Sequence, residues 1–457
     1  MTEYNTGLFR VAVAAALLLT THVHATNGYF THGVGTHNKA MAGAGTASPD
    51  QAIDAATNPA AAILVGDRLD LGLALFSPQR DYQTSASQIN GNFGAFTVGP
   101  NSIDSDNDVF PIPYAAKAWQ LDNDRAIALM FYGRGGMNTE YNGGTASFSP
   151  DGPGPLPVFT FPGTFGAGRT GVDLSQAFLE LAYAGKQGSL AWGIAPVLAA
   201  QVFEATGVGN FAGFTRTFAA SGGTVMPQNL TDRGHDWSFG YGIKLGVIWQ
   251  ASGTISLGLS YQSRLEMDDF DKYSDLFARS GGFDIPASTR LGLSWQTSDA
   301  LQLHFDIEHS QFGDVDSVGN PMAGIVNCPT AGFGGTNVEA CLGGKEGMGF
   351  GWDDMTTYKL GAKWSVADLP GWIFRAGVSY GEQPIPESDA VINILAPAVP
   401  EQHFTFGVSH ERENGHEWSL SLMYAPENEE TGPNFFDPTQ QVKLSMSQFE
   451  LEFSYSW

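Results

Sequence analysis

The C-terminal stretch SQFELEFSYSW (residues 447–457) alternates apolar and polar side chains without interruption. Its apolar positions are Phe449, Leu451, Phe453, Tyr455 and Trp457. A period of two places all five on one face of a β-strand and the polar residues on the other. An edge strand of a soluble sheet would have the same pattern, so the rest of the chain must decide what kind of sheet this strand joins.

The same period recurs along the chain from residue 67 onward. In 301–310, for example, Leu301, Leu303, Phe305 and Ile307 alternate with polar residues. The polar face of these segments carries glycine, small residues and opposed charges, which favours a wet barrel lumen over the dry interior of a sandwich. We predict fourteen strands, at about 67–76, 112–121, 125–133, 173–184, 189–199, 235–250, 254–264, 287–297, 301–312, 356–366, 372–380, 402–411, 417–425 and 447–457.

The connections between these segments alternate in length. Short turns such as 122–124 and 185–188 are followed by long connections rich in Gly, Pro and Asp, such as 134–172 and 426–446. Short periplasmic turns and long extracellular loops alternate in this way in outer-membrane barrels. The predicted fold class is therefore all-β, a 14-stranded antiparallel transmembrane β-barrel.

The first 25 residues indicate export. Arg10 precedes the apolar run 11–19, and Val23-His24-Ala25 resembles a small-x-small cleavage site. This run is far shorter than the ~20 residues that a membrane-spanning helix needs. An exported chain without such a helix is either soluble outside the cytoplasm or spans a membrane as a barrel. The terminal aromatic strand resembles the sorting signal that the barrel-assembly machinery reads, which favours the Gram-negative outer membrane.

The composition excludes several classes of protein. The 457 residues include 22 Lys and Arg against 47 Asp and Glu, a formal net charge of -25, although only 15% of residues are charged. A nucleic-acid-binding protein needs a basic face, so no nucleic-acid partner is expected. Two cysteines are too few for a disulfide scaffold or a Cys₄ zinc site. Acidic residues gather at 104–108, 268–275 and 427–430, which predicts an acidic rim on a neutral barrel.

Residues 26–66 separate the export signal from the first predicted strand. They are rich in Gly and Ala and do not alternate. Small side chains and few charges suit packing within a tube, so a hatch inside the lumen is predicted, with a periplasmic tail as the alternative. Asn58, Pro59 and Ala60 can form a capped turn. The predicted organisation is a signal peptide (1–25), a hatch (26–66) and a transmembrane barrel (67–457).

Several short motifs, taken in order, resemble the FadL-type outer-membrane transporters of long-chain fatty acids and other hydrophobic compounds. They are Gly43-Ala-Gly45 followed by Asp54 and Asn58-Pro59-Ala60, Phe131-Tyr132-Gly133, Ile285-Pro286-Ala287 with Leu291-Gly292 and Asp306, Lys359-Leu360-Gly361, 375–380 and the terminal strand. Each motif is weak alone, but their order and spacing are fairly specific. The resemblance implies a hatch that plugs fourteen strands, a kinked third strand and lateral release of the ligand into the membrane.

The expected ligand is a long-chain fatty acid, with a hydrocarbon or aromatic compound as the alternative within the same family. Two predicted loops, at 200–234 and 265–286, carry apolar clusters, and exposed clusters of this kind commonly form binding surfaces. The alternative is that these side chains only pack the loops into a lid. By the resemblance, they correspond to the external capture groove of the family: Phe203, Phe211, Phe214, Phe218, Leu265, Phe270, Tyr273, Leu276 and Phe277.

Gly133, Gly135 and Gly136 end the third predicted strand around Arg134. Glycines within a strand mark bulges and bends, so they suit the kink that opens the wall. A flexible entry into the next loop is the alternative. Under the first interpretation these three glycines form the kink of the lateral exit.

Charged residues on the predicted lumen face cluster on strands eight to eleven. Cross-strand ion pairs are the first interpretation, since an unpaired buried charge is costly. The alternative is that Arg290, Lys359 or Arg375 anchors the carboxylate of a ligand, a task to which Arg is geometrically suited. The sequence does not decide which cation would do so.

Cys328 and Cys341 lie in one predicted extracellular loop, and the exported compartment favours their disulfide. A loop of this length contributes about 3 kcal/mol in the entropy model. Asp104, Asp106 and Asp108 lack the Gly and distal Glu of a calcium loop, and His32 and His37 are expected to pack as polar residues. No metal, cofactor or catalytic residue is predicted.

Three other classes compete with transport. An outer-membrane lipid-modifying enzyme would need a nucleophile motif, and His304 beside Asp306 has no identifiable Ser. A general porin would not need the hatch-like segment, and a structural or adhesive barrel would not need the apolar loop clusters. We expect a monomer whose partners are a hydrophobic small molecule, outer-membrane lipid or lipopolysaccharide, and the barrel-assembly machinery.

Overall fold

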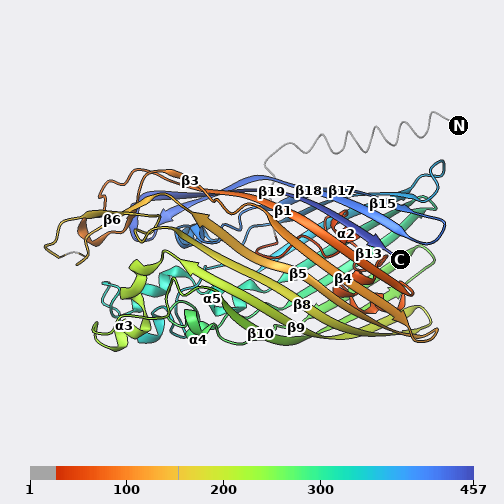
Figure 1. The fold of residues 1–457 in the computed structure, drawn as a ribbon, viewed down its shortest axis with the longest axis horizontal. Helices are drawn as coiled ribbons and strands as arrows, with labels where there is room; N and C mark the ends of the chain where they lie inside the picture. Colours follow the sequence, from red (N-terminus) through yellow and green to blue (C-terminus); the bar gives the residue numbers. More distant parts are fainter. Residues whose placement is uncertain (1–26, 153) are drawn as a thin grey trace.

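The computed structural model describes residues 27–152 and 154–457, so the predicted signal peptide at 1–25 lies outside the described residues. Fourteen strands close a barrel through antiparallel pairs (Figure 1). They are β1 (Arg68–Thr84), β4 (Phe110–Gln120), β5 (Arg125–Tyr141), β8 (Thr170–Gln187), β9 (Leu190–Thr206), β10 (Asp236–Gln250), β11 (Ile255–Gln262), β13 (Ser288–Ser298), β14 (Leu301–Ser310), β15 (Met355–Ser365), β16 (Trp372–Gly381), β17 (Gln402–Glu411), β18 (Glu417–Asn434) and β19 (Asp437–Ser456).

The last strand closes the barrel against the first. β19 pairs with β18 on one side and with β1 on the other, with Leu71 opposite Tyr455 and Leu73 opposite Phe453. Leu73 and Phe453 are about half exposed, at 47% and 50%, because they face outward, whereas Glu452 on the other face is buried. Each predicted segment corresponds to one barrel strand, so the predicted fold class is confirmed.

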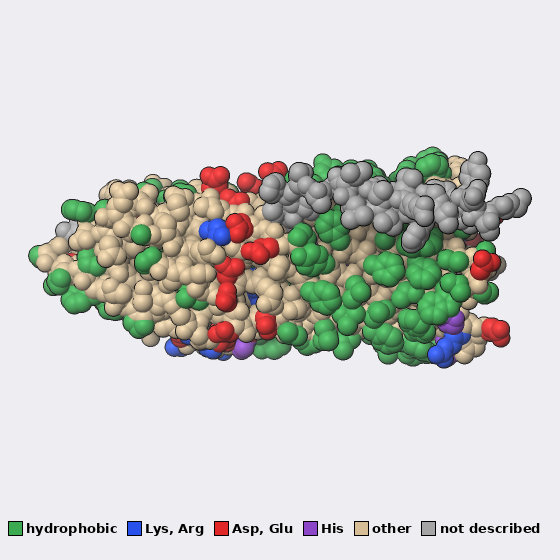
Figure 2. Space-filling view, turned by 90° about the horizontal axis from the view of Figure 1, so that it is seen from above, with side chains coloured by type: hydrophobic (Ala, Val, Ile, Leu, Met, Phe, Trp, Pro, Cys, Tyr) green, Lys and Arg blue, Asp and Glu red, His purple; other side chains and the backbone are tan. Residues whose placement is uncertain are grey.

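The outer surface follows the alternation of the strands. Figure 2 shows apolar side chains gathered in a band over one half of the molecule, with Asp and Glu side chains along the edge of that band. A lipid-facing band needs apolar side chains all round, and charges are tolerated only beyond it. No helix among residues 27–152 and 154–457 is long and apolar enough to cross a membrane.

Several strands continue beyond their predicted ends. β1 reaches Thr84 and β5 reaches Tyr141. The largest difference is at 426–446, predicted as a long loop, where β18 and β19 instead form one long hairpin that closes at Asn434 and Asp437. The prediction of a loop is wrong there because the ladder of backbone hydrogen bonds extends above the lipid band, where the outward face no longer has to be apolar.

We call the connections at 85–109, 142–169, 207–235, 263–287, 311–354, 382–401 and 435–436 the crown. A three-stranded sheet lies within it, formed by β2 (Thr97–Val98), β6 (Thr145–Phe148) and β7 (Phe159–Pro162), while β3 (Ser102–Asp104) pairs with β1 and β12 (Glu266–Met267) with β10. Its helices are short: η3 (Asn92–Gly94), η4 (Gly209–Phe214), α3 (Arg216–Ala220), η5 (Asp271–Tyr273), α4 (Ala278–Gly281), η6 (Phe312–Asp314), α5 (Asp316–Gly319), η7 (Met322–Asn327), η8 (Val338–Ala340), η9 (Glu387–Asp389) and η10 (Ile392–Ile394).

Residues 27–66 form the N-terminal segment, which carries α2 (Thr36–Lys39), η1 (Ala52–Ala56) and η2 (Pro59–Ile63). Nearly all of its residues from 27 to 63 are buried, and its helices contact the inward faces of barrel strands. Asn58 caps η2, since its side-chain Oδ1 accepts a hydrogen bond from Ala60 N at 3.1 Å. The predicted capped turn is therefore present, and the segment lies in the lumen.

Glycines on the inward faces of the strands make room for this segment. A Cβ at Gly377 would lie 2.2 Å from the carbonyl carbon of Met41, and one at Gly193 would lie 2.4 Å from that of Pro59. Backbone therefore meets backbone at a distance that no side chain allows. Gly258 likewise faces the backbone of Thr46, whereas a Cβ at the other inward glycines would first meet a side-chain atom of the segment: Gly246, Gly292, Gly361 and Gly407. Part of the high glycine content therefore reflects the fit between the barrel and its N-terminal segment.

Candidate ligand passage through the barrel wall

The hydrogen-bond ladder between β4 and β5 covers only part of these strands. It runs from Gln120 opposite Ala126 to Tyr114 opposite Tyr132 and ends there. Residues 110–113 of β4 continue to pair with β1, and β5 beyond Gly133 continues to pair with β8. The two strands therefore separate at this height, which leaves a gap in the wall.

β5 carries a bulge at the same height. Its register with β8 shifts between Gly133 and Gly135, so Arg134 is the extra residue. A Cβ at Gly135 would lie 2.0 Å from Gln176 Oε1, and one at Gly133 would lie 3.0 Å from Ile112 Cγ2, across the gap. The three glycines that the sequence analysis assigned to a kink thus lie at a bulge beside a break in the ladder.

The N-terminal segment binds the bulge from inside the barrel. Thr31 N donates to Arg134 O at 2.8 Å, and Gly136 N donates to Tyr29 O at 3.1 Å. The guanidinium of Arg134 also lies over the ring of Phe30, 4.2 Å from its centroid. Residues 29–31 therefore form hydrogen bonds with backbone groups of β5 that have no partner on β4.

A cavity of about 450 Å³ lies at the gap. Most of its lining is apolar, and part of that lining faces the lumen, from Tyr29, Phe30 and Ile112. Another part is formed by Phe131 and Trp237, whose side chains are 45% and 60% exposed on the outer face of the barrel. The cavity therefore connects the lumen with the lipid-facing surface through the wall.

The apolar clusters predicted for the loops are mostly buried. Phe203 lies on β9 and faces inward, where its ring centroid is 4.6 Å from that of Phe277 and 4.9 Å from that of Tyr273. The expected exposure is wrong for six of the nine residues, Phe203, Phe211, Leu265, Phe270, Tyr273 and Phe277, because they form the core of the crown. Leu276, Phe214 and Phe218 are partly exposed.

A small apolar pocket of about 40 Å³ remains within the crown. Phe203, Phe211, Leu276 and Phe277 contribute to its lining. It lies among residues of both predicted capture loops, so the two loops meet there. The role of these residues in binding a ligand stays a prediction.

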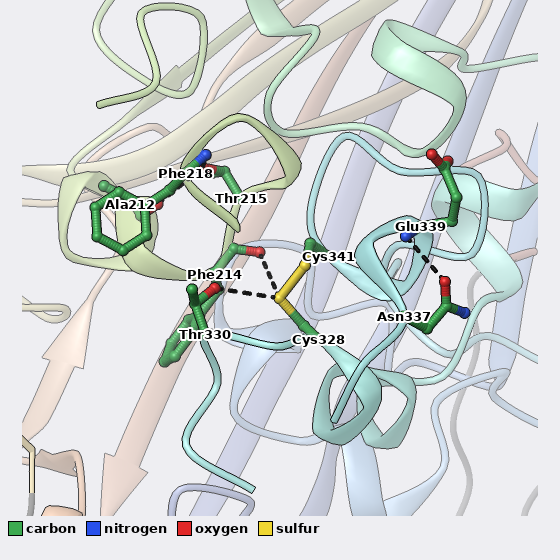
Figure 3. The surroundings of a disulfide bond; sticks show 9 residues. All are labelled: Ala212, Phe214, Thr215, Phe218, Cys328, Thr330, Asn337, Glu339 and Cys341. Carbon is green, nitrogen blue, oxygen red and sulfur yellow. Dashed lines mark hydrogen bonds between the residues drawn. A yellow bond between two sulfur atoms is a disulfide. The ribbon is translucent and has the colours of Figure 1, made fainter. Parts of the chain in front are cut away.

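Cys328 and Cys341 form a disulfide within the 311–354 connection. Figure 3 shows the bond beside Phe214 and Thr215 of the 207–235 connection. Leu342 N donates to Phe214 O at 2.9 Å. Ser280 N, in the other predicted capture loop, donates to Gly343 O at 3.0 Å. The disulfide-closed segment therefore holds both loops.

The lumen cations singled out in the sequence are engaged in ion pairs. The carboxylate oxygens of Glu308 lie 2.7 Å from nitrogen atoms of Arg290 and Lys359 and 2.9 Å from a nitrogen atom of Arg134. Arg375 lies 3.2 Å from Asp50 of the N-terminal segment. Cross-strand pairing, the first interpretation of these charges, is thus present, and ligand anchoring by Arg290, Lys359 or Arg375 stays a prediction.

A buried ion pair and a His–Glu contact also tie the N-terminal segment to the last two strands. Lys39 Nζ lies 3.0 Å from Glu450 and 2.7 Å from Glu452, and all three side chains are buried. His37 Nε2 lies 2.5 Å from Glu417. Sequence reasoning missed Lys39, although two acids on the inward face of the terminal strand signalled the need for a buried cation.

The side chain of Asp54, in η1 of this segment, is buried. Burial raises the pKa of Asp54 to about 6, although the backbone N–H groups of Gln51 and Asp50 donate to its carboxylate at 2.9 and 2.7 Å.

Among residues 27–152 and 154–457, no group of three or more His, Cys, Asp or Glu side chains is placed to hold a metal ion.

The model of one protein family matches residues 16–417, and its description is outer membrane protein transport protein (OMPP1/FadL/TodX). Solved structures with the same fold include the toluene transporter TodX of P. putida, at 17% identity, 93% coverage of this chain, 98% of that chain and a TM-score of 0.61. A FadL homologue of Pseudomonas aeruginosa matches at 14% identity, 94% and 98% coverage and a TM-score of 0.59.

The toluene transporter TbuX of Ralstonia pickettii also matches, at 15% identity, 93% and 98% coverage and a TM-score of 0.55. At these identities the likeness shows the fold alone. A comparison with curated protein sequences finds no significant match.

Proposed function

The chain belongs to the OMPP1/FadL/TodX family of outer-membrane transport proteins, and on this premise we propose that it carries long-chain fatty acids and releases them sideways into the membrane. Its place is the Gram-negative outer membrane, and its general task is to transport hydrophobic compounds. The identity of the ligand and its route through the molecule are the proposal.

The cavity through the wall is the observation that carries this proposal. A hydrophobic solute gains nothing from an open, water-filled pore, because it must remain out of water along its path. The cavity between β4 and β5 has an apolar lining from Tyr29 inside to Phe131 outside. A ligand held there can enter the lipid without crossing the length of the barrel.

The N-terminal segment acts as a hatch in this proposal. It fills the lumen, so it blocks a straight path to the periplasm, and it also binds the bulge of β5 through Tyr29 and Thr31. Movement of residues 29–31 would widen the cavity toward the crown and would free the edge of β5. The hatch therefore closes the axial path while it controls the lateral one.

The crown captures the ligand before it reaches the wall. Its apolar pocket beside Leu276 and Phe277 is too small for a long acyl chain in this conformation. The partly exposed Phe214 and Phe218 offer the first apolar contacts, and separation of the two loops would enlarge the pocket. Ligand entry thus requires the aromatic core of the crown to open.

A fatty acid is proposed as the ligand, and a hydrocarbon or aromatic compound is the second candidate. TodX and TbuX, which share the fold, are toluene transporters, and this favours the second candidate. The cavity volume of about 450 Å³ falls within the range of about 300–1,000 Å³ typical of small-molecule sites and accommodates either class. The choice between the two classes rests on the charge of the ligand's head group.

Other parts of the proposal concern partners and chemistry. The protein acts as a monomer without a catalytic step, contacts lipid and lipopolysaccharide through its apolar band and acidic edge, and is inserted by the barrel-assembly machinery. The two rival classes differ in what they do to a solute: a lipid-modifying enzyme would release a chemically altered product, and a general porin would let sugars pass.

The test is uptake of labelled palmitate, hexadecane and toluene by cells with and without the protein, together with sugar permeation into liposomes that contain it. Greater uptake of palmitate than of the neutral compounds supports the proposal. Uptake of hexadecane or toluene alone selects the second candidate. No change for any hydrophobic compound, or rapid sugar permeation, contradicts transport of this kind, and a chemically altered palmitate would indicate an enzyme.

A further inference from the structure

Arg80 lies on the inward face of β1, above the lipid-facing leucines and opposite Met446 of β19. Its side chain lines the cavity that passes through the wall. The guanidinium carbon lies 5.6 Å from the ring centroid of Phe110, which also lines the cavity. Arg80 is only 7% exposed, so its charge is held away from water.

Arg80 differs from the other buried cations of the described chain in lacking an acidic partner. Seven Lys and Arg side chains are buried within residues 27–152 and 154–457. Six of them have a carboxylate within 4.0 Å, and Arg80 has none. The six are Lys39, Arg134, Lys244, Arg290, Lys359 and Arg375.

The hydrogen bonds of Arg80 leave part of its fork free. One terminal nitrogen donates to the carbonyl oxygen of Asn107. Its Nε is buried without a partner among the described residues. Burial of a charge with no counter-ion in contact is costly. A ligand that supplies the missing negative charge would recover part of that cost as binding free energy.

The chemistry of the missing partner follows from the shape of the guanidinium and from its surroundings. A planar fork matches a carboxylate, with which it forms parallel charge-assisted hydrogen bonds. The rest of the cavity is lined mainly by apolar side chains such as Ile112 and Met446. A cation without an acidic partner in a mainly apolar cavity fits a molecule with one anionic head and a long apolar tail.

We propose that Arg80 binds the carboxylate of a long-chain fatty acid at the opening between β4 and β5. This inference rests on the proposed function and extends it, since it names the head group that the site recognises. Arg134 also lines the cavity, but it lies 2.9 Å from Glu308, a carboxylate that it shares with Arg290 and Lys359, whereas Arg80 has no carboxylate within 4.0 Å. Arg80 thereby makes the passage selective for acids over hydrocarbons of equal length.

The test measures ligand binding to the purified full-length protein in detergent, with palmitate, hexadecanol and hexadecane as probes. Arg80→Met keeps the aliphatic stem and removes the charge. Since hydrogen bonds to charged groups contribute about 1.5–3 kcal/mol, palmitate binding should weaken roughly 10- to 150-fold. Hexadecanol and hexadecane should bind as before, and Arg80→Lys should recover part of the palmitate affinity. Lys443→Met, which removes the exposed Lys443 of the Lys443–Glu429 pair, is the matched control.

Each other outcome overturns a distinct part of the argument. Equal binding of palmitate to the parent protein and to Arg80→Met refutes the anchor and leaves fatty-acid transport standing. Equal weakening of all three probes shows that Arg80 only shapes the cavity, which also refutes the anchor. If the parent protein binds hexadecane but not palmitate, both the anchor and the choice of fatty acid are wrong. If it binds none of the three, the proposed function itself fails.

Discussion

Replacement of Lys39 by Met should release the N-terminal segment from the barrel. In the parent protein, the ammonium group of Lys39 lies 3.0 Å from Glu450 and 2.7 Å from Glu452. These carboxylates are 2% and 1% exposed and lie on the same face of β19. Methionine fills a similar volume, so the substitution removes the charge and largely keeps the packing.

The magnitude follows from the burial of the pair. Removal of one partner from a buried ion pair costs about 3–5 kcal/mol, because the remaining charge is left uncompensated. The barrel ladder between β18, β19 and β1 is unaffected, so the cost falls on docking of the N-terminal segment. At about 1.4 kcal/mol for each factor of ten, the ratio of docked to undocked segment falls roughly 100- to 3,000-fold.

Ion conductance in planar bilayers tests for the undocked population, because the docked segment fills the lumen and we expect ions to pass when it leaves. Lys39→Met should produce frequent open events, and neutralisation of both acids in Lys39→Met/Glu450→Gln/Glu452→Gln should suppress them. Lys443→Met removes an exposed pair worth less than about 1 kcal/mol and should resemble the parent protein. The reasoning is refuted if Lys39→Met conducts no more than Lys443→Met does.

The remaining predictions concern pH, packing and the crown. Burial raises the pKa of Asp54 from 3.8 to about 6. Between these pH values the docked segment therefore holds a proton that the undocked segment loses. The free energy of docking becomes more favourable by up to about 3 kcal/mol as the pH falls from above 6 to about 4. Leak conductance should therefore decrease on acidification, and Asp54→Asn should remove that dependence; an unchanged pH profile in the variant would show that another group titrates. Gly377→Val would place a side chain against the backbone of Met41, where Cβ alone comes within 2.2 Å of the carbonyl carbon, so the variant should leak; a tight variant would mean that the segment can shift. Loss of the disulfide in Cys328→Ala/Cys341→Ala should destabilise the crown by about 3 kcal/mol, with faster proteolysis within 311–354 and an intact barrel; equal proteolysis would argue that the crown packing alone holds the loops.

The strands could be predicted from the sequence because lipid imposes a simple demand on them. Every outward residue within the bilayer must be apolar, so Leu71, Leu73 and Phe453 mark their strands by period alone. Above the lipid that demand ends, and the extension of β18 and β19 through 426–446 was not foreseen. The pattern also could not show that Phe203 continues a strand and faces inward.

The site was predicted in part. Three glycines pointed to a kink in the third strand, and the bulge at Arg134 lies among them. The sequence predicts a loop at 77–111, between the first two strands, and a single Arg in a loop has no special meaning, so Arg80 could not be singled out. Its importance depends on which carboxylates lie near it in three dimensions, and no spacing along the chain contains that information.

Lateral release through the gap between β4 and β5 is the central claim, and closing the gap tests it most directly. A Cβ at position 133 would lie 3.0 Å from Ile112 Cγ2 on the other side of the gap, so the ring in Gly133→Phe should fill the opening. Gly253→Phe places the same side chain in a turn with open space around it and serves as the control. If release is lateral, Gly133→Phe should abolish uptake of labelled palmitate while Gly253→Phe transports normally. Unchanged palmitate uptake by a folded Gly133→Phe protein would contradict it.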